Sequence, residues 1–118
     1  MVSKGKNTDE CAWREVIGLI GDKWSVMILH TLCHNRLRYS EIQRQVDGIS
    51  QKVLTATLRQ LERDGIIKRT VYPVVPPRVE YELTPLGHSV FEIIESLRDW
   101  SIAHLDQVQA ARARYDAK

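Results

Sequence analysis

Apolar residues recur along the chain first with a helical period, then with a strand period, and finally with a helical period again. Between Cys11 and Ile20, the apolar positions 13, 16, 17 and 20 share one face of a predicted short helix. After Gly21 and Asp22, the segment KWSVMILHTLC carries apolar residues on nearly every side. Because such a helix is typical of a buried position, we predict a central core helix, with Cys33 as a small core residue.

Two further helices are predicted between about residues 40 and 64. Ser40 and Gln43 match the Ser-x-x-Gln capping box that begins a helix. Ser50 is placed to cap the next helix, and Gly65 is placed to end it in a left-handed conformation. Two helices joined by a short turn that contains glycine indicate a helix-turn-helix.

A hairpin is predicted next, over about residues 66–84. IIKRTVY (66–72) and the alternating segment at 79–83 read as two strands, with Pro73, Pro76 and Pro77 between them. Proline cannot donate a hydrogen bond to a sheet, so the prolines are expected at an exposed tip. Earlier in the chain, before the helix-turn-helix, the HNRLR segment (34–38) is predicted to be a turn. Thr84-Pro85 is a favourable helix start, and the final helix is predicted to run from about 85 to 115.

The order of these elements predicts an α+β fold that is mainly α, a winged helix-turn-helix with N- and C-terminal dimerisation helices. The 118 residues suffice for one domain, which we place at 11–118 after a flexible polar tail at 1–10. The tail has no signal-peptide core, and no apolar run approaches the roughly 20 residues of a membrane span. Only two cysteines are present, which fits a reducing, cytoplasmic location.

Charge is unevenly distributed, and this indicates where a partner binds. Residues 50–79 hold six basic and two acidic side chains, although the whole chain carries a net charge of only +2. On the helix from 51 to 64, Leu54, Leu58 and Leu61 share one face, and a basic face lies opposite. We expect contacts with double-stranded DNA from Arg38, Ser40, Ser50, Gln51, Lys52, Thr55, Arg59, Arg63 and Arg78.

Each of these contacts has a structural alternative. The helix face would otherwise be an ordinary solvated surface, and Arg38 and Ser40 a free charge and a helix cap. In the DNA interpretation, these two anchor a phosphate through side chains and backbone N–H groups. Arg78, beside the prolines, either enters the minor groove or pairs with Glu80 or Glu82.

Four stretches together resemble the HxlR family of bacterial winged helix regulators, relatives of the MarR group. They are Cys11, LIGDKWSVMILHTL, RYSEIQRQVDGISQKVLTATLRQLERDGIIKR and VPPRVEYELTPLG. The resemblance implies a homodimer that binds a palindromic operator and represses, less often activates, nearby genes in a bacterial cytoplasm. The chain departs from the family pattern in having Ala12 after the N-terminal cysteine, where proline is frequent.

The last helix also predicts a dimer on physical grounds. It carries more apolar surface than one small core needs, and monomers rarely expose large apolar patches. A partner helix would cover this surface and set two recognition helices about one DNA turn apart. The predicted interface consists of Val90, Ile94, Leu97, Trp100, Leu105 and Val108; the alternative is a helix folded on its own domain.

Cys11 is the candidate sensor. The resemblance implies that a cysteine here responds to oxidants, quinones or aldehydes. A helix start favours the thiolate, and Arg14 adds a positive charge; the alternative is an inert thiol at the dimer interface. His30, Cys33 and His34 have ligand-like spacing, but no second cluster completes a metal site, so no metal or other cofactor is expected.

Other functions remain as alternatives. The same fold also suits a protein-interaction module, or a regulator that responds to a small ligand without a thiol switch. The sequence has no phosphate-binding glycine loop, no complete ligand set and no nucleophile with a base at motif spacing, so an enzyme is not expected.

Overall fold

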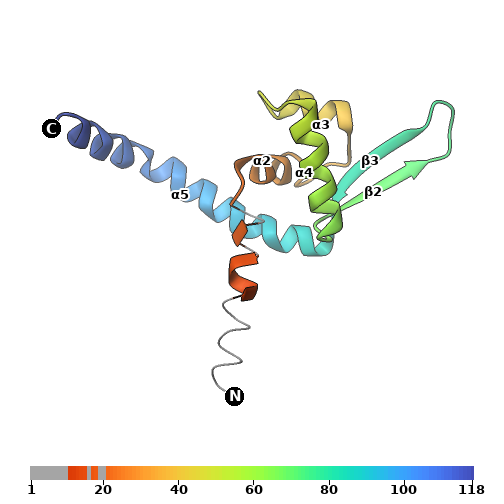
Figure 1. The fold of residues 1–118 in the computed structure, drawn as a ribbon, viewed down its shortest axis with the longest axis horizontal. Helices are drawn as coiled ribbons and strands as arrows, with labels where there is room; N and C mark the ends of the chain where they lie inside the picture. The colour runs from red at the N-terminus through yellow and green to blue at the C-terminus, as the bar shows by residue number, and fades with distance from the viewer. Residues whose placement is uncertain (1–10, 16, 19–20) are drawn as a thin grey trace, which may run out of the picture.

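Helices and a small sheet form the body of the molecule, and the last helix runs out from it (Figure 1). The computed structural model describes residues 11–15, 17–18 and 21–118. Residues 11–15 and 17–18 are helical, as predicted for the N-terminal helix. The rest of that predicted helix, and the predicted flexible tail at 1–10, lie outside the described residues.

Helix α2 (Lys23–Thr31) lies in the middle of the body and contributes two residues to its core. Ile28 and Leu29 are completely buried, whereas Met27 is exposed. The prediction that this helix is buried on every side is therefore wrong, because one face of it stays open. Cys33 follows the end of the helix and is only half-buried, so it is not the core residue that the sequence predicted.

Helix α3 (Tyr39–Gln45) begins one residue before the predicted cap at Ser40. The predicted Ser-x-x-Gln box is wrong. Instead, the backbone N–H of Arg38 donates a hydrogen bond of 2.8 Å to the Glu41 carboxylate. A carboxylate near the first turn also interacts favourably with the helix dipole.

Helix α4 (Gln51–Arg63) has the boundaries that its flanking residues predict. The Ser50 hydroxyl accepts a hydrogen bond of 3.2 Å from the Val53 N–H, which is a typical N-cap. Gly65 adopts φ +75°, a left-handed conformation that favours glycine, and it ends the helix as expected. Both predictions for this helix are confirmed.

The sheet contains three antiparallel strands in the order β1-β3-β2. Strands β2 (Ile67–Tyr72) and β3 (Arg78–Leu83) form the predicted hairpin, and residues 73–77 connect them. All three prolines of this segment lie in the connection, where no ladder hydrogen bond is lost. Strand β1 (Leu37–Arg38) pairs with β3 inside the segment predicted as a turn, which corrects that prediction.

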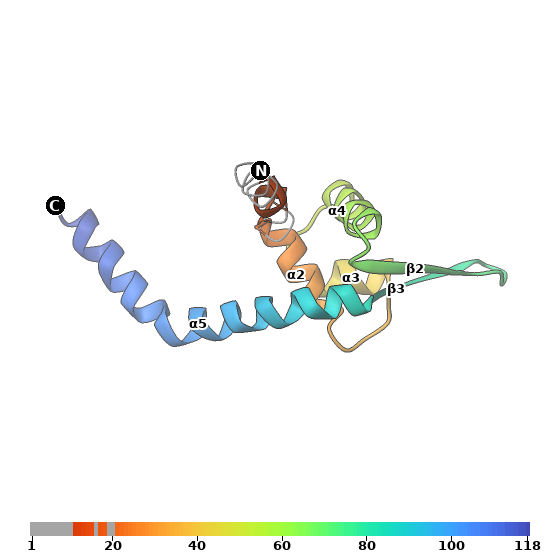
Figure 2. The same ribbon diagram turned by 90° about the horizontal axis from the view of Figure 1, so that it is seen from below.

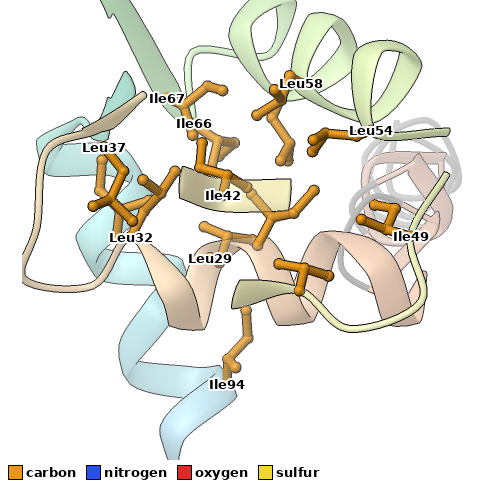
Figure 3. Packing of buried hydrophobic residues seen from close by; sticks show 14 residues of the cluster. Leu29, Leu32, Leu37, Ile42, Ile49, Leu54, Leu58, Ile66, Ile67 and Ile94 are labelled. Atoms are coloured by element: carbon orange, nitrogen blue, oxygen red, sulfur yellow. The ribbon is translucent and has the colours of Figure 1, made fainter. Parts of the chain in front are cut away.

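One hydrophobic core joins α2, α3, α4, the sheet and the first half of α5 (Figure 3). Its buried residues are Ile28, Leu29, Leu32, Leu37, Ile42, Val46, Ile49, Leu54, Leu58, Leu61, Ile66, Ile67, Leu83 and Ile94. Leu54, Leu58 and Leu61 are the predicted apolar face of α4, so the opposite face of that helix is left for solvent or a partner.

Helix α5 (Pro85–Asp116) is the longest element, with 32 residues and a length of roughly 48 Å. The Thr84 hydroxyl accepts a hydrogen bond of 3.0 Å from the Gly87 N–H, and Pro85 stands at the first helical position, as predicted. The hairpin and the C-terminal half of α5 project from opposite sides of the body (Figures 1 and 2). Within the described residues, the end of α5 is therefore left uncovered.

Candidate nucleic-acid interface

The outward face of α4 is polar and basic. Gln51, Lys52, Thr55, Ala56 and Arg59 line one shallow depression on it. The side chains of Lys52 and Arg59 are exposed there and carry the positive charge of this face. Both can reach guanine edges or phosphates when the helix lies in a major groove. Four of the predicted positions, Gln51, Lys52, Thr55 and Arg59, thus lie together on one surface.

Tyr39 attaches this face to the start of α3. Its hydroxyl lies 3.0 Å from the carbonyl oxygen of Gln51 and 3.0 Å from the hydroxyl of Thr55. Because the tyrosine proton is donated to the carbonyl, Thr55 must donate to Tyr39. Thr55 therefore offers a ligand only its acceptor lone pairs, which narrows the role predicted for it. Tyr39 belongs to no periodic pattern in the sequence, so its contribution was missed.

Two other predicted α4 contacts lie at the ends of the helix. The Ser50 hydroxyl is occupied as the N-cap acceptor, which leaves its proton for a ligand. Arg63, the last residue of α4, is exposed but does not line the depression. Arg63 therefore lies just outside the depression, one helical turn beyond Arg59.

A second hollow lies between the start of α3 and the hairpin connection. It has a volume of about 530 Å³, and Arg38, Ser40 and residues 74–79 are among its lining. The backbone N–H of Arg38 is already bound to Glu41, so it is not free for a phosphate as the sequence suggested. The guanidinium of Arg38 and the hydroxyl of Ser40 are the groups that remain exposed to a ligand.

Arg78 stands at the base of the connection, opposite Tyr72 in the sheet. Its guanidinium carbon lies 4.7 Å from the centroid of the Tyr72 ring, and its Nε lies 3.3 Å from Glu80 Oε2. The ion pair that the sequence offered as the alternative role of Arg78 is thus present with Glu80. Its side chain is still 42% exposed and lines the hollow, so the guanidinium remains accessible from the hollow.

Arg36 organises the carboxylates of β3 and was not identified from the sequence. Its guanidinium lies 2.9 Å from Glu82 Oε2 and 3.9 Å from Glu80 Oε1, and it donates a hydrogen bond of 2.7 Å to the Tyr72 hydroxyl. The pKa of Arg36 is raised, chiefly by the charge of Glu82. One guanidinium offsets only part of the charge of the two carboxylates, which lessens the repulsion that they would exert on a polyanion.

The predicted sensor and the histidines lie on other parts of the molecule. Cys11 is exposed and its thiol is free. His30 Nδ1 lies 3.7 Å from Glu95, and the rings of His30 and His34 both lie 6.2 Å from that of Phe91. Among the residues that the structure describes, no three His, Cys, Asp or Glu side chains are grouped to hold a metal.

The apolar side chains of α5 separate into two sets. Leu97, Trp100 and Leu105 are exposed and form the apolar surface predicted for a dimer interface, and the half-buried Val108 lies further along the helix. Ile94 is only 3% exposed because it faces the core of its own protomer, so its assignment to the dimer interface is corrected. The half-buried Val90 also packs against that core.

Comparison with known proteins decides the family. The model of the HxlR-like helix-turn-helix family matches residues 19–109, which is most of the chain. The chain belongs to the HxlR-like helix-turn-helix family. It is 43% identical over 104 residues to the HTH-type transcriptional regulator YtfH of Escherichia coli, covering 88% of this chain and 82% of that protein.

Solved structures agree with the HxlR-like assignment. The transcriptional regulator ytfH of Salmonella typhimurium superposes with a TM-score of 0.78 at 44% identity, over 85% of this chain and 89% of that chain. The redox regulator HypR in its reduced form superposes with a TM-score of 0.79 at 33% identity, over 84% of this chain and 98% of that chain. The predicted winged helix fold and HxlR family are confirmed.

Membership of the HxlR-like family makes the protein a transcriptional regulator with a helix-turn-helix domain, and it implies DNA binding. None of the helices within 11–15, 17–18 and 21–118 has both the length and the apolar character of a membrane span.

Proposed function

We propose that the protein binds a palindromic operator as a homodimer and represses the adjacent genes. The observation that carries this proposal is the continuity of the candidate surface. Tyr39 joins the depression on α4 to the start of α3. The hairpin of β2, residues 73–77 and β3 is called the wing below. The start of α3 and the wing line the same hollow. One duplex can contact these parts together, with α4 in the major groove and the wing beside the backbone or minor groove.

The dimer in this proposal is supported by the exposed apolar surface of α5. Leu97, Trp100 and Leu105 lie on a helix that extends beyond its own core. A second copy with the same surface would cover it about a two-fold axis, and two-fold symmetry matches a palindromic operator.

The test is selection of bound duplexes from the source genome, followed by affinity measurement at several salt concentrations. We expect a palindromic sequence and an affinity that falls steeply with salt, because basic side chains displace counterions from phosphates. Recovery of no duplex, or an affinity for DNA that does not respond to salt, would favour the protein-interaction module instead.

Two arginine substitutions are expected to affect this binding differently. Arg59→Ala should reduce discrimination between the selected duplex and one with altered half-sites, by about 1–3 kcal/mol, because Arg59 faces the base edges. Arg78→Ala should weaken both duplexes about equally and lower the salt slope by about one, because Arg78 holds the backbone. Fluorescence anisotropy measures both, with Arg112→Ala on exposed distal α5 as the control. Unchanged affinity and slope for Arg78→Ala would remove that residue from the interface.

We further propose that Cys11 makes the regulator responsive to oxidants or electrophiles. The support is its exposed, free thiol and the similarity to HypR, which is described as a redox regulator. Modification of a thiol on the N-terminal helix would alter that helix and, through the dimer, the spacing of the two α4 helices.

Diamide or a quinone is therefore expected to release operator DNA from the wild type but not from Cys11→Ser. The matched control is Cys33→Ser, which removes the half-buried thiol and should leave the response intact. A gel-shift titration against reagent concentration measures release. An identical response of wild type and Cys11→Ser would leave a regulator without this thiol switch, such as one that responds to a small ligand.

A further inference from the structure

The tip of the wing is an exposed apolar segment that carries no charge. Residues 73–77 read Pro-Val-Val-Pro-Pro, and all five are exposed. Val75 is 100% exposed and Val74 is 49% exposed. A run of exposed apolar residues is unfavourable in water, so it points to a contact with a partner.

No other part of the chain that the structure describes covers this tip. The wing extends outward from the sheet, on the side opposite to the distal part of α5 (Figure 1). The three prolines also restrict the conformations of the tip. A rigid apolar tip loses little conformational freedom when it is inserted into a partner.

The charges around the tip indicate which partner it meets. Arg38 and Arg78 line the same hollow as Val74, Val75 and the neighbouring prolines. Apolar residues thus form the end of the wing, and cations lie at its base. This order suits a partner with phosphates on its outside and apolar surface deeper in a groove, which describes duplex DNA.

The connection between the hollow and the α4 face also favours DNA as the partner of the wing tip. The hollow includes Tyr39, whose hydroxyl is bonded to Gln51 and Thr55 of the α4 face. A duplex held by that face therefore continues across the hollow toward the wing tip. A protein partner would need to approach this surface beside the bound duplex.

We infer that the wing tip inserts into the minor groove as an apolar wedge and bends the operator. This inference rests on the proposed DNA binding and deepens it. Arg38 and Arg78 hold phosphates at the edges of the groove, while Val75 and the adjacent prolines press on sugars and a base step. Apolar wedges of this kind unstack a step and kink a duplex by roughly 20–90°.

A sequence preference follows without any hydrogen bond to a base. Pyrimidine–purine steps such as TA and CA unstack most easily, so the operator is expected to carry them where the two wings lie. These positions flank the half-sites that α4 reads. The tip residues would then determine specificity through the deformability of DNA.

The test compares Val75→Ser with Val71→Ser on an end-labelled duplex recovered by selection with the wild type. Both changes remove the same apolar groups from exposed positions, but Val71 is 51% exposed within β2 and does not line the hollow. At saturating protein, wild type and Val71→Ser are expected to raise energy transfer between the ends of the duplex. Val75→Ser should still bind, as measured by anisotropy, but lose most of that rise.

A second readout repeats the selection with Val75→Ser. The half-sites are expected to persist, while the enrichment of pyrimidine–purine steps outside them disappears. The inference of an apolar wedge is wrong if Val75→Ser bends the duplex as the wild type does, or if the wild type leaves the duplex straight. In either case, a protein is the remaining candidate partner for the wing tip. If the wild type selects no duplex, the proposed function fails together with this inference.

Discussion

Replacement of Gly87 with alanine is expected to lower the free energy of unfolding by roughly 2–4 kcal/mol. The added Cβ would overlap the carbonyl oxygen of Ile66 and lie 3.4 Å from the Cβ of Leu83. That oxygen accepts a hydrogen bond of 3.1 Å from the Thr84 N–H, whereas the Thr84 hydroxyl makes its shorter bond, 2.6 Å, to the Gly65 carbonyl. Backbone cannot move aside as a flexible side chain does, so α5 must shift away from Ile66, the residue before β2, and loosen the bond from the Thr84 N–H. Urea unfolding followed by circular dichroism measures the loss.

Gly18→Ala is the matched control for this substitution. Gly18 is helical, and a Cβ added to it meets nothing within 4 Å. The free energy of unfolding of Gly18→Ala should therefore stay unchanged or rise by up to about 1 kcal/mol, since alanine has a higher helix propensity than glycine. Equal unfolding midpoints for Gly87→Ala and the wild type would show that the junction of α5 with β2 is looser than the structure indicates.

Substitution of Leu105 with glutamate is expected to dissociate the proposed dimer and to weaken operator binding by roughly 10²–10⁴-fold. Leu105 is 49% exposed and does not belong to the core of its own protomer, so the fold should survive. In the dimer, the carboxylate would be buried without a partner. Each protomer would then bind one half-site alone. In a dimer, by contrast, binding of the first half-site gives the second protomer a high effective concentration at the other half-site. Light scattering after size exclusion measures the mass, and anisotropy measures the affinity.

Gln107→Glu adds the same charge two residues further along α5 and serves as the control. It replaces an exposed polar residue, so mass and affinity should both stay near those of the wild type. A dimer of Leu105→Glu with full affinity would mean that another surface joins the protomers.

The local features of the chain were predictable because each depends on neighbours in the sequence. The caps at Ser50 and Thr84 and the left-handed Gly65 follow from residues within one helical turn. The alternating apolar and polar residues at 79–83 and the prolines after β2 likewise define the hairpin and its tip. The predicted contrast between a buried and a wet face is wrong, because residues 78–82 are all half-buried and only Leu83 is buried. Most of the wing and α4 could therefore be placed before the structure was known.

The arrangement of the candidate site was less predictable, since its contacts join residues that are distant in the chain. Arg36 and Glu82 are 46 positions apart, yet their side chains form an ion pair of 2.9 Å. Strand β1 has only two residues, too few to display alternation, and it forms by pairing with β3. Neither feature leaves a periodic signal in the sequence.

By itself, the sequence determined the helix-turn-helix, the basic face of α4, the apolar tip of the wing and the HxlR-like family, because these depend on local pattern and motif order. The tertiary structure alone decided that Ile94 faces the core, that Tyr39 engages Thr55, and that Arg78 shares one hollow with Arg38. Periodicity specifies which side of an element is apolar. Only packing against other elements decides which part of that side is covered and which polar groups are already bonded.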